Sequence, residues 1–438
     1  MATFTSYFPG NVTPDHYSPA LPSFDYMPFF DEIVRFDQAN QTSASATAIK
    51  FNLSNGLKLT LAGTGFTFDS AGNPTGGTLT GMSIFLNNGT TKMQELTGLS
   101  VGLESFHDAI AAYDQYGMAR FLMRGNDVLK GSAGDQDLNG YSGNDTFIGG
   151  SGNDFVTGGE GKDTYDGNGG AFDSLNFNDA YYTPTAFRGI NLNASTGVVI
   201  DPWGNSETFT QFEQFRGTQF ADIFTGSNVN EEFMGLGGRD TINGGGGNDS
   251  VLYHRDDRRG GTGSVTVNLA TGNAIDGFGK ADKLISIENA RTGNAADKLT
   301  GSTAVNFLRA GAGNDLLAGG LGNDRLQGEG GKDTFIFDTK LNASTNVDTI
   351  GDFVALDDTI RLDNDIFTTL VGTGVLTAAQ FYKSAAGVAH DANDRIIYET
   401  DTGKLFYDSN GNASGGSVLF ATIGTNLALT SADFFVVT

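Results

Sequence analysis

The sequence lacks cysteine altogether and holds only 1 tryptophan, 8 prolines and 4 histidines in 438 residues. Without cysteine no disulfide can cross-link the chain. An extracellular fold would therefore need another kind of cross-link, which bound metal ions could provide. None of the histidines stands in an H-E-x-x-H arrangement, which excludes a zinc protease of that type. These absences favour a function other than catalysis.

Basic residues are also scarce. The chain has 26 Lys plus Arg against 51 Asp plus Glu, for a formal net charge of −25. Nucleic acid is excluded as an expected partner, because binding to it requires basic side chains that neutralise phosphates. Cations are the partners that this charge favours.

Long hydrophobic runs are missing too. No stretch approaches eighteen consecutive apolar residues, so we expect no membrane-spanning helix. The first ten residues have neither the basic region nor the apolar core of a cleavable export signal, and we expect any export to use another route. Because 38% of the residues are apolar and 34 are Phe, the chain can still form a packed core.

Glycine is abundant, with 63 residues, and much of it recurs in units of nine. From Gly140 to Asp166 the units read GYSGNDTFI, GGSGNDFVT and GGEGKDTYD, and the preceding LMRGNDVLK and GSAGDQDLN keep the same frame. Two later arrays continue this step, with an acidic or amide residue at the sixth place and an apolar residue at the eighth. A fixed period of this kind predicts a repeat architecture.

The sequence also contains a longer duplication, which includes several units of nine. Several residues recur 75 positions later, as Asp297 does relative to Asp222 and Glu288 relative to Glu213. The spacers between the arrays, from about 171 to 216 and from 253 to 292, are therefore copies of one unit. We expect them to be structural rather than catalytic inserts.

Each unit of nine predicts a turn followed by a short strand. Glycines at places one, two and four permit positive φ and close backbone approach, so the first six residues can form a tight turn. The last three can form a strand whose central apolar residue points inward. Residues eighteen apart should then stack at the roughly 4.8 Å spacing of neighbouring strands, so that two units make one coil.

The acidic residue at place six predicts a calcium site. Calcium prefers six to eight oxygen ligands, and such a turn offers a carboxylate together with backbone carbonyls. The candidate ligands are Asp127, Asp135, Asp137, Asp145, Asp154, Asp163, Asp222, Glu231, Asp240, Asp249, Asp297, Asn306, Asp315, Asp324 and Asp333. Turns eighteen residues apart would hold one ion between them.

Five such pairs have aspartate at both places: 127 with 145, 145 with 163, 222 with 240, 297 with 315, and 315 with 333. Three are mixed: Gln136 with Asp154, Glu231 with Asp249, and Asn306 with Asp324. We therefore expect about five to eight calcium ions. With a dissociation constant near ~0.1 mM, calcium at about 1 mM would stabilise the fold by roughly 1.4 kcal/mol per site. Submicromolar calcium would contribute almost nothing.

The units of nine resemble the G-G-x-G-x-D-x-U-x consensus of the repeats-in-toxin (RTX) family, whose repeats are a known calcium-binding form of parallel β-helix. The resemblance covers residues 122 to 337. It implies a β-roll that folds on calcium binding after type I secretion from a Gram-negative bacterium. Asp433-Phe-Phe-Val-Val resembles the uncleaved carboxy-terminal export signal of such proteins. Departures at Gln136, Val229, Glu231, Ala304 and Asn306 put single ions in doubt, but not the fold.

The predicted fold is all-β: a parallel β-roll between an amino-terminal β-rich cap with one helix and a carboxy-terminal β cap. Alternating residues on both sides of Asn55-Gly56 predict a hairpin in the first cap. The expected domains are 1–121 with a helix at about 104–123, array 122–170, spacer 171–216, array 217–252, spacer 253–292, array 293–337, and cap 338–438.

The sequence favours an extracellular, non-catalytic protein with a structural or adhesive role at the cell surface or in the matrix. Its expected partners are calcium, the type I secretion apparatus through the carboxy terminus, and surface polysaccharide or further copies of the chain. The alternative is an enzyme acting on extracellular polysaccharide, with its site in residues 1–121 or in a spacer. A carboxylate pair for glycan chemistry would suffice, and spacing alone does not select one.

Overall fold

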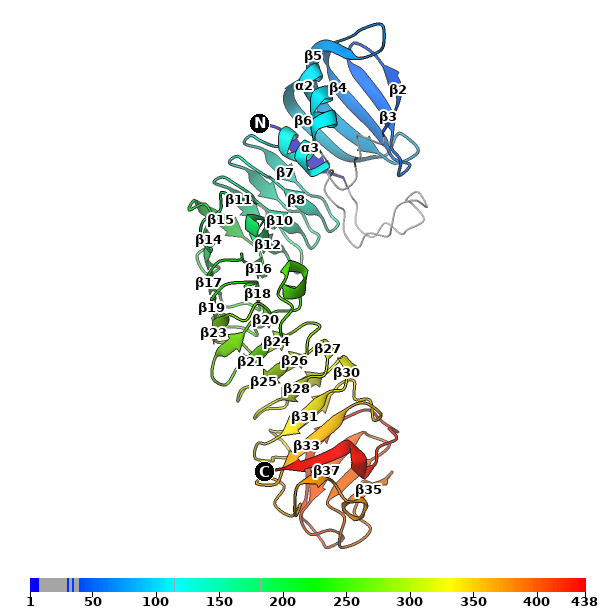
Figure 1. Ribbon diagram of the computed structural model, residues 1–438, viewed down its shortest axis with the longest axis vertical. Coiled ribbons are helices and arrows are strands. Elements are labelled where there is room, and N and C mark those ends of the chain that lie inside the picture. The colour runs from blue at the N-terminus through cyan, green and yellow to red at the C-terminus, as the bar shows by residue number, and fades with distance from the viewer. Residues whose placement is uncertain (8–29, 31–33, 35–38, 114, 182) are drawn as a thin grey trace. The chain divides into compact units, whose positions relative to one another are not determined.

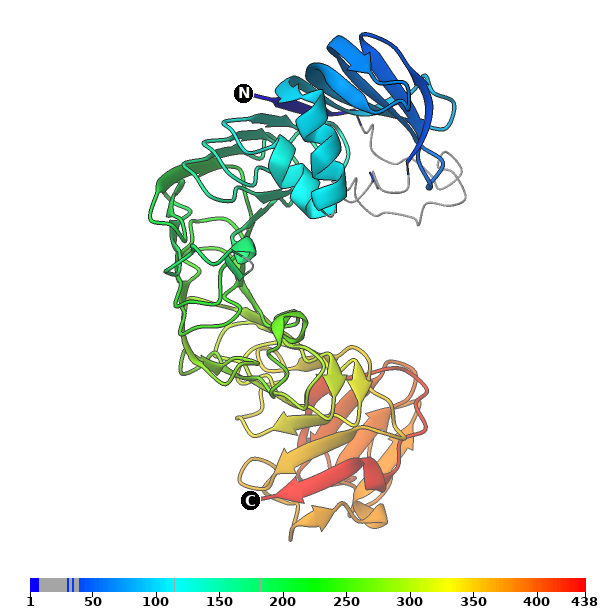
Figure 2. The same ribbon diagram turned by 45° about the horizontal axis from the view of Figure 1, so that its top comes forward.

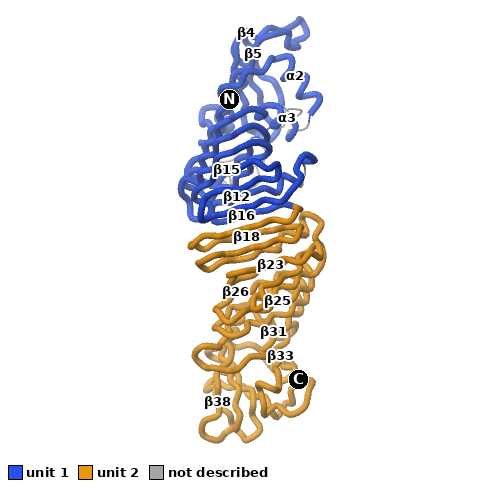
Figure 3. Tube along the Cα trace, turned by 90° about the vertical axis from the view of Figure 1, so that its left-hand side faces the viewer, with its two compact units in different colours: residues 1–218 blue, residues 219–438 orange. Residues whose placement is uncertain are grey.

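The computed structural model describes residues 1–7, 30, 34, 39–113, 115–181 and 183–438. The chain divides into two compact units, residues 1–218 and 219–438, which are treated in turn (Figure 3). The fold is almost entirely β, and its repeat region consists of parallel sheets made mostly of three-residue strands (Figure 1). Within the described residues, no helix has the length and apolar character needed to cross a membrane.

The first unit opens with an antiparallel sheet. Its strands are β1 (Thr3–Ser6), β2 (Asn40–Ala44), β3 (Ala48–Asn52), β4 (Lys58–Phe68), β5 (Pro74–Phe85) and β6 (Lys92–Gly102). The predicted hairpin is present, since β3 pairs with β4 so that Ile49 lies opposite Leu61. Strand β1 joins this sheet to the roll, because it pairs antiparallel with β6 and parallel with the first roll strand, β7 (Val128–Lys130).

The single helix expected at about 104–123 is wrong. The structure has two helices there, α2 (Leu103–Ala112) and α3 (Gln115–Leu122), and the backbone of Tyr113, directly after α2, is extended. Helix α2 buries Leu103, Phe106 and Ala109 and lies against β5 and β6 (Figure 2). The periodicity of the apolar residues continues across this break, which is why one helix was expected.

The roll of the first unit has two parallel sheets. One contains β7, β9 (Thr146–Ile148), β11 (Thr164–Asp166) and β15 (Ser206–Thr210); the other contains β8 (Asp137–Asn139), β10 (Phe155–Thr157), β12 (Ser174–Asn176) and β16 (Gln214–Arg216). Leu129, Phe147 and Tyr165 stand opposite one another on successive strands, eighteen residues apart as predicted. Their side chains are buried and fill the interior between the sheets.

The second unit repeats this arrangement. One sheet contains β17 (Ile223–Thr225), β19 (Thr241–Asn243), β21 (Thr266–Asn268), β22 (Asn273–Ile275), β23 (Ala281–Ile285), β25 (Lys298–Thr300), β28 (Leu316–Ala318), β31 (Thr334–Phe337) and β33 (Thr359–Asp363). The other contains β18 (Glu232–Met234), β20 (Ser250–Leu252), β24 (Asn289–Arg291), β26 (Phe307–Arg309), β29 (Arg325–Gln327) and β32 (Asp348–Ile350). The short strands β27 (Ala312–Gly313) and β30 (Gly330–Gly331) pair beside them.

Each spacer is an enlarged coil rather than a separate domain. The first adds the 3-10 turn η3 (Asn178–Tyr181) and strands β13 (Asn191–Asn193) and β14 (Val198–Ile200); the second adds η4 (Asp256–Arg259), β21 and β22. The chain then rejoins the roll, so that Leu175 lies opposite Phe215 in the first unit, and Val251 opposite Ala290 in the second. The spacers therefore interrupt the repeat without interrupting the stack of strands.

The chain closes with a cap in the second unit. It contains β34 (Gly374–Val375), η5 (Ala378–Gln380), β35 (Phe381–Ser384), β36 (Ile396–Glu399), β37 (Lys404–Asp408), β38 (Ser417–Thr422), η6 (Ser431–Asp433) and β39 (Phe434–Val437). Strands β36 and β37 form an antiparallel hairpin. Strand β39 pairs parallel with β33 and buries Phe434 and Val436, so the last residues complete the sheet that the roll began.

Candidate metal sites

The place-six carboxylates form ladders along the edges of the roll. Asp145 is 1% exposed, and its Oδ1 accepts a hydrogen bond from the backbone N–H of Asp127, one coil earlier, at 2.7 Å. Asp163 accepts from the N–H of Asp145 at 2.7 Å in the same way. On the other edge, Asp154 accepts from the N–H of Gln136 at 2.9 Å. Each acid therefore holds the turn of the preceding coil through a hydrogen bond from its backbone.

The ladders repeat in the second unit. Asp240 accepts from the N–H of Asp222, Asp249 from that of Glu231, Asp315 from that of Asp297, Asp324 from that of Asn306, and Asp333 from that of Asp315. These contacts join the residues of all eight predicted pairs that lie eighteen apart. The geometry thus brings together thirteen of the fifteen candidate ligands, all but Asp135 and Asp137.

Asp135 and Asp137 lie elsewhere. The buried residue at place six of that turn is Gln136, which is 1% exposed. Asp135 stands at place five, where its Oδ1 accepts from the N–H of Asn153 at 2.8 Å, as Asn126 accepts from Asn144. Asp137 is the first residue of β8 and is half-buried. The strict frame of nine puts a neutral amide at place six, with an acid on each side of it.

The second carboxylate oxygen of several ladder acids has no hydrogen-bond donor. Oδ2 of Asp127, Asp145, Asp154, Asp240, Asp249, Asp315 and Asp324 is buried, and none of the described residues donates to it. A buried carboxylate oxygen without a donor is costly, because it has lost its water and gained no partner. Such atoms mark the place where a cation would bind.

The glycine at place one borders these free oxygens. A Cβ added to Gly140 would lie 2.3 Å from Asp145 Oδ2 and 2.8 Å from the carbonyl oxygen of Gly158, one coil later. At Gly149 the same atom would lie 2.5 Å from Asp154 Oδ2 and 2.7 Å from the carbonyl oxygen of Gly167. Any side chain would fill this space. Carboxylate and carbonyl oxygens so arranged are the ligands that calcium prefers, and the residues present therefore fit a calcium ion.

The electrostatics of the ladders also favour a bound cation. Burial, with a smaller contribution from the charges of Asp163 and Asp127, raises the pKa of Asp145 to about 8, although the hydrogen bond from the N–H of Asp127 lowers it. Burial likewise raises the pKa of Asp154 to about 8. Stacked acids of this kind either hold protons or require positive charge between them.

The ladders extend beyond the three arrays, which the sequence interpretation missed. Asp173, Glu207 and Glu213 accept from the N–H groups of Asp154, Asp163 and Asp173 in the first unit. In the second unit the corresponding acceptors are Asp282, Glu288, Asp348 and Asp358, which bind the N–H groups of Asp240, Asp249, Asp324 and Asp333. All seven stand two places before a buried residue in a strand, and this shorter acid-x-apolar signal would have found them.

One sequence match to a catalytic motif was also missed. Gly98-Leu99-Ser100-Val101-Gly102 fits G-x-S-x-G, the pattern whose serine lies on a sharp strand-to-helix turn in serine hydrolases. Here Ser100 lies within the antiparallel strand β6, and its side chain is exposed. The strand continues for two residues beyond it before α2 begins. Ser100 is therefore not placed as a nucleophile elbow.

Comparison with protein families finds a match to the RTX calcium-binding nonapeptide repeat, at residues 123–145, 139–171, 216–257, 292–326 and 300–335. A search of curated proteins finds no match. Among solved structures, the chain is similar to an extracellular lipase, LipA from Serratia marcescens, at 14% identity and a TM-score of 0.14. That similarity covers 72% of this chain and only 38% of the lipase, and it supports no conclusion on function.

Proposed function

Because this chain belongs to the repeats-in-toxin family, whose nonapeptide repeats bind calcium, we propose that it is an exported protein whose roll folds when calcium binds along the two edges. The ligands would be the place-six residues Asp127, Asp145, Asp154, Asp163, Asp222, Glu231, Asp240, Asp249, Asp297, Asn306, Asp315, Asp324 and Asp333, with backbone carbonyls of the same turns. Bound calcium would supply the positive charge that the stacked carboxylates lack.

The observation that carries this proposal is that one carboxylate oxygen of several ladder acids accepts a hydrogen bond, while the other is buried without a donor among the described residues. Oδ1 of Asp145 holds the preceding coil, while the buried Oδ2 meets no donor in the described parts of the chain. Repetition of this arrangement in both units supports a function of the whole roll rather than of one site. The pairs within the arrays correspond to about five to eight ions.

Folding after export would explain how a carboxy-terminal segment that is buried in the folded cap could serve as an export signal. Asp433-Phe-Phe-Val-Val, which resembles an export signal, begins at the last residue of η6 and continues as β39 in the sheet of the cap. Phe434 and Val436 are buried, so a secretion apparatus could contact them only in an unfolded chain. The low calcium concentration inside a cell would keep the chain in that state. We therefore place the folded protein outside the cell.

We propose a structural or adhesive role at the cell surface or in the matrix, which the basic residues on the outer side of the roll support. In the second unit, Arg309 lies directly opposite Arg291 on the neighbouring parallel strand. The guanidinium of Arg325 lies 4.7 Å from the ring centroid of Phe307, also in this sheet. Within the chain, Arg309 Nε donates to Glu329 Oε1 at 3.0 Å, so this arginine already has an anion beside it. Arg291 and Arg325 are the basic residues of this sheet that support an anionic polysaccharide as the partner.

Two measurements on the full chain test the proposal. Light scattering with an anionic polysaccharide should show calcium-dependent binding or assembly, weakened severalfold by R291Q/R325Q and unchanged by the control variant K58Q in the amino-terminal sheet. Turnover on a panel of polysaccharides should be absent. Turnover that disappears when one acidic pair in residues 1–121 or in a spacer is replaced would instead establish the enzyme alternative.

A further inference from the structure

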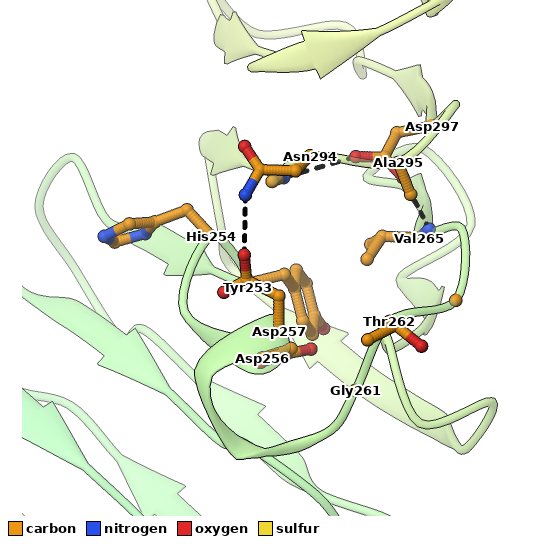
Figure 4. A pocket seen from close by; sticks show the side chains of 12 residues that line it. Tyr253, His254, Asp256, Asp257, Gly261, Thr262, Val265, Asn294, Ala295 and Asp297 are labelled. Atoms are coloured by element: carbon orange, nitrogen blue, oxygen red, sulfur yellow. Dashed lines mark hydrogen bonds between the residues drawn. The ribbon is translucent and has the colours of Figure 1, made fainter.

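The second spacer and the first turn of the array after it line a partly open cavity of about 300 Å³ (Figure 4). Three segments line it: Tyr253 to Asp257, Gly261 to Val265, and Gly293 to Asp297. Its walls include the carboxylates of Asp256, Asp257 and Asp297. Of these three acids, Asp297 also belongs to a consensus pair, whereas Asp256 and Asp257 lie outside the arrays.

The segment before β21 is a degenerate repeat. Gly260-Gly261-Thr262-Gly263-Ser264-Val265-Thr266-Val267-Asn268 has glycine at places one, two and four and an apolar residue at place eight, but Val265 replaces the acid at place six. Strand β21 pairs with β25 in the regular register, with Val267 opposite Leu299. The N–H of Val265 donates to Asp297 Oδ1 at 2.7 Å, as ladder residues do. Residues 260–265 and 292–297 are therefore successive turns of one edge.

Two acids outside the repeat take the place of the missing one. Asp256 and Asp257 begin η4, and both line the cavity between these turns. Asp256 is 1% exposed; its Oδ2 accepts from the N–H of Gly277 at 3.0 Å, and its Oδ1 is buried with no donor among the residues described. Asp257 Oδ2 accepts from Asn294 Nδ2 at 2.6 Å, which ties η4 to the next turn, as Figure 4 shows.

We propose that this cavity is an additional calcium site, in which Asp256 and Asp257 replace the place-six carboxylate that Val265 cannot supply. The inference rests on the proposed calcium-binding roll. Three carboxylates line the cavity, those of Asp256, Asp257 and Asp297, and this concentration of negative charge favours a cation. The cavity is large enough to hold several water molecules beside an ion. The ion would keep several of its waters and exchange more readily than an ion in the arrays.

Anomalous diffraction from crystals of the unmodified chain grown in calcium is the first test. A calcium peak within the ~2.3–2.6 Å ligand distance of Asp256 Oδ1 is expected, together with peaks along the array turns. Peaks along the arrays with none in this cavity would overturn the additional site alone. Peaks in neither place would overturn the proposed function as well.

Calcium stoichiometry by calorimetry is the second test, and it can be read in solution. The double variant D256N/D257N should bind one ion fewer than the unmodified chain, whereas D108N, on the exposed face of α2, should bind the same number. Adding V265D restores the consensus acid and should recover the lost ion. An unchanged stoichiometry in D256N/D257N would overturn the site. If the double variant does not fold in calcium, the diffraction test on the unmodified chain decides.

Discussion

Asp145 holds the backbone N–H of Asp127 with one carboxylate oxygen, at 2.7 Å, and leaves the other oxygen buried without a donor among the described residues. The first contact fixes the register of two coils, and the second oxygen is the cation ligand that we propose. Asp154, Asp240, Asp249, Asp315 and Asp324 act in the same way, so the proposed neighbouring sites share residues. Loss of one acid should therefore weaken two coils.

Neutralising Asp145 tests this sharing. D145N keeps an oxygen for the N–H of Asp127 but removes the charge at the turns on both sides. We expect one to two calcium ions fewer by calorimetry and a loss of about 1–3 kcal/mol of stability in millimolar calcium. The matched control is D135N, because the neighbouring coil has asparagine at the same place and the contact with Asn153 is retained. Equal behaviour of the two variants would count against the ladder.

The place-one glycine provides a steric test. In G140A the new Cβ would lie 2.3 Å from Asp145 Oδ2, so the turn must shift away from the cation ligand. We expect a loss of about 1–3 kcal/mol in calcium and a higher calcium concentration at the folding midpoint. G330A is the control, because a Cβ there meets nothing within 4 Å. Both are measured by calcium titration followed by circular dichroism.

A gain of function is expected at Gln136. Q136D restores the consensus acid at place six beside Asp154, so it should add one ion and about 1.4 kcal/mol of stability in millimolar calcium. In chelator the same change should destabilise the chain, since it adds a buried charge. An effect of the same sign in both solutions would contradict the proposed role of this place.

The raised pKa values predict how the calcium-free chain responds to pH. The pKa of Asp145 is about 8 in the fold, against about 3.9 for an ordinary aspartate, because burial disfavours the charge. The folded state therefore holds more protons than the unfolded state between these values, and its stability falls as pH rises from about 4 to about 8. In chelator, circular dichroism should show more β structure at pH 5 than at pH 8. More structure at pH 8 would contradict this.

Much of this fold could be predicted from the sequence because one physical pattern is repeated many times. The period of nine gave the strands, their stacking eighteen residues apart and most ladder acids, since turn glycines and a buried apolar residue recur in fixed places. The acids of the spacers, such as Glu207 and Asp282, were missed because their turns do not have glycine at places one, two and four together, although their contacts are the same. The degenerate repeat that ends at Asn268 was missed because Val265 replaces the acid.

Other features depend on contacts that no local pattern encodes. Strand β1 pairs with both β6 and β7, which are distant in sequence, and so joins the first sheet to the roll. The break at Tyr113 between α2 and α3 interrupts an apolar periodicity that continues on both sides. In such places tertiary packing decides between conformations that the sequence allows equally.

Circular dichroism of the full chain in excess chelator and in millimolar calcium, with ion uptake measured by calorimetry, tests the central claim most directly. At neutral pH the chain in chelator should lose most of its β signal, and added calcium should restore it with the uptake of at least about five ions. Identical spectra in the two solutions, with no ion uptake, would contradict the claim that calcium holds the coils together.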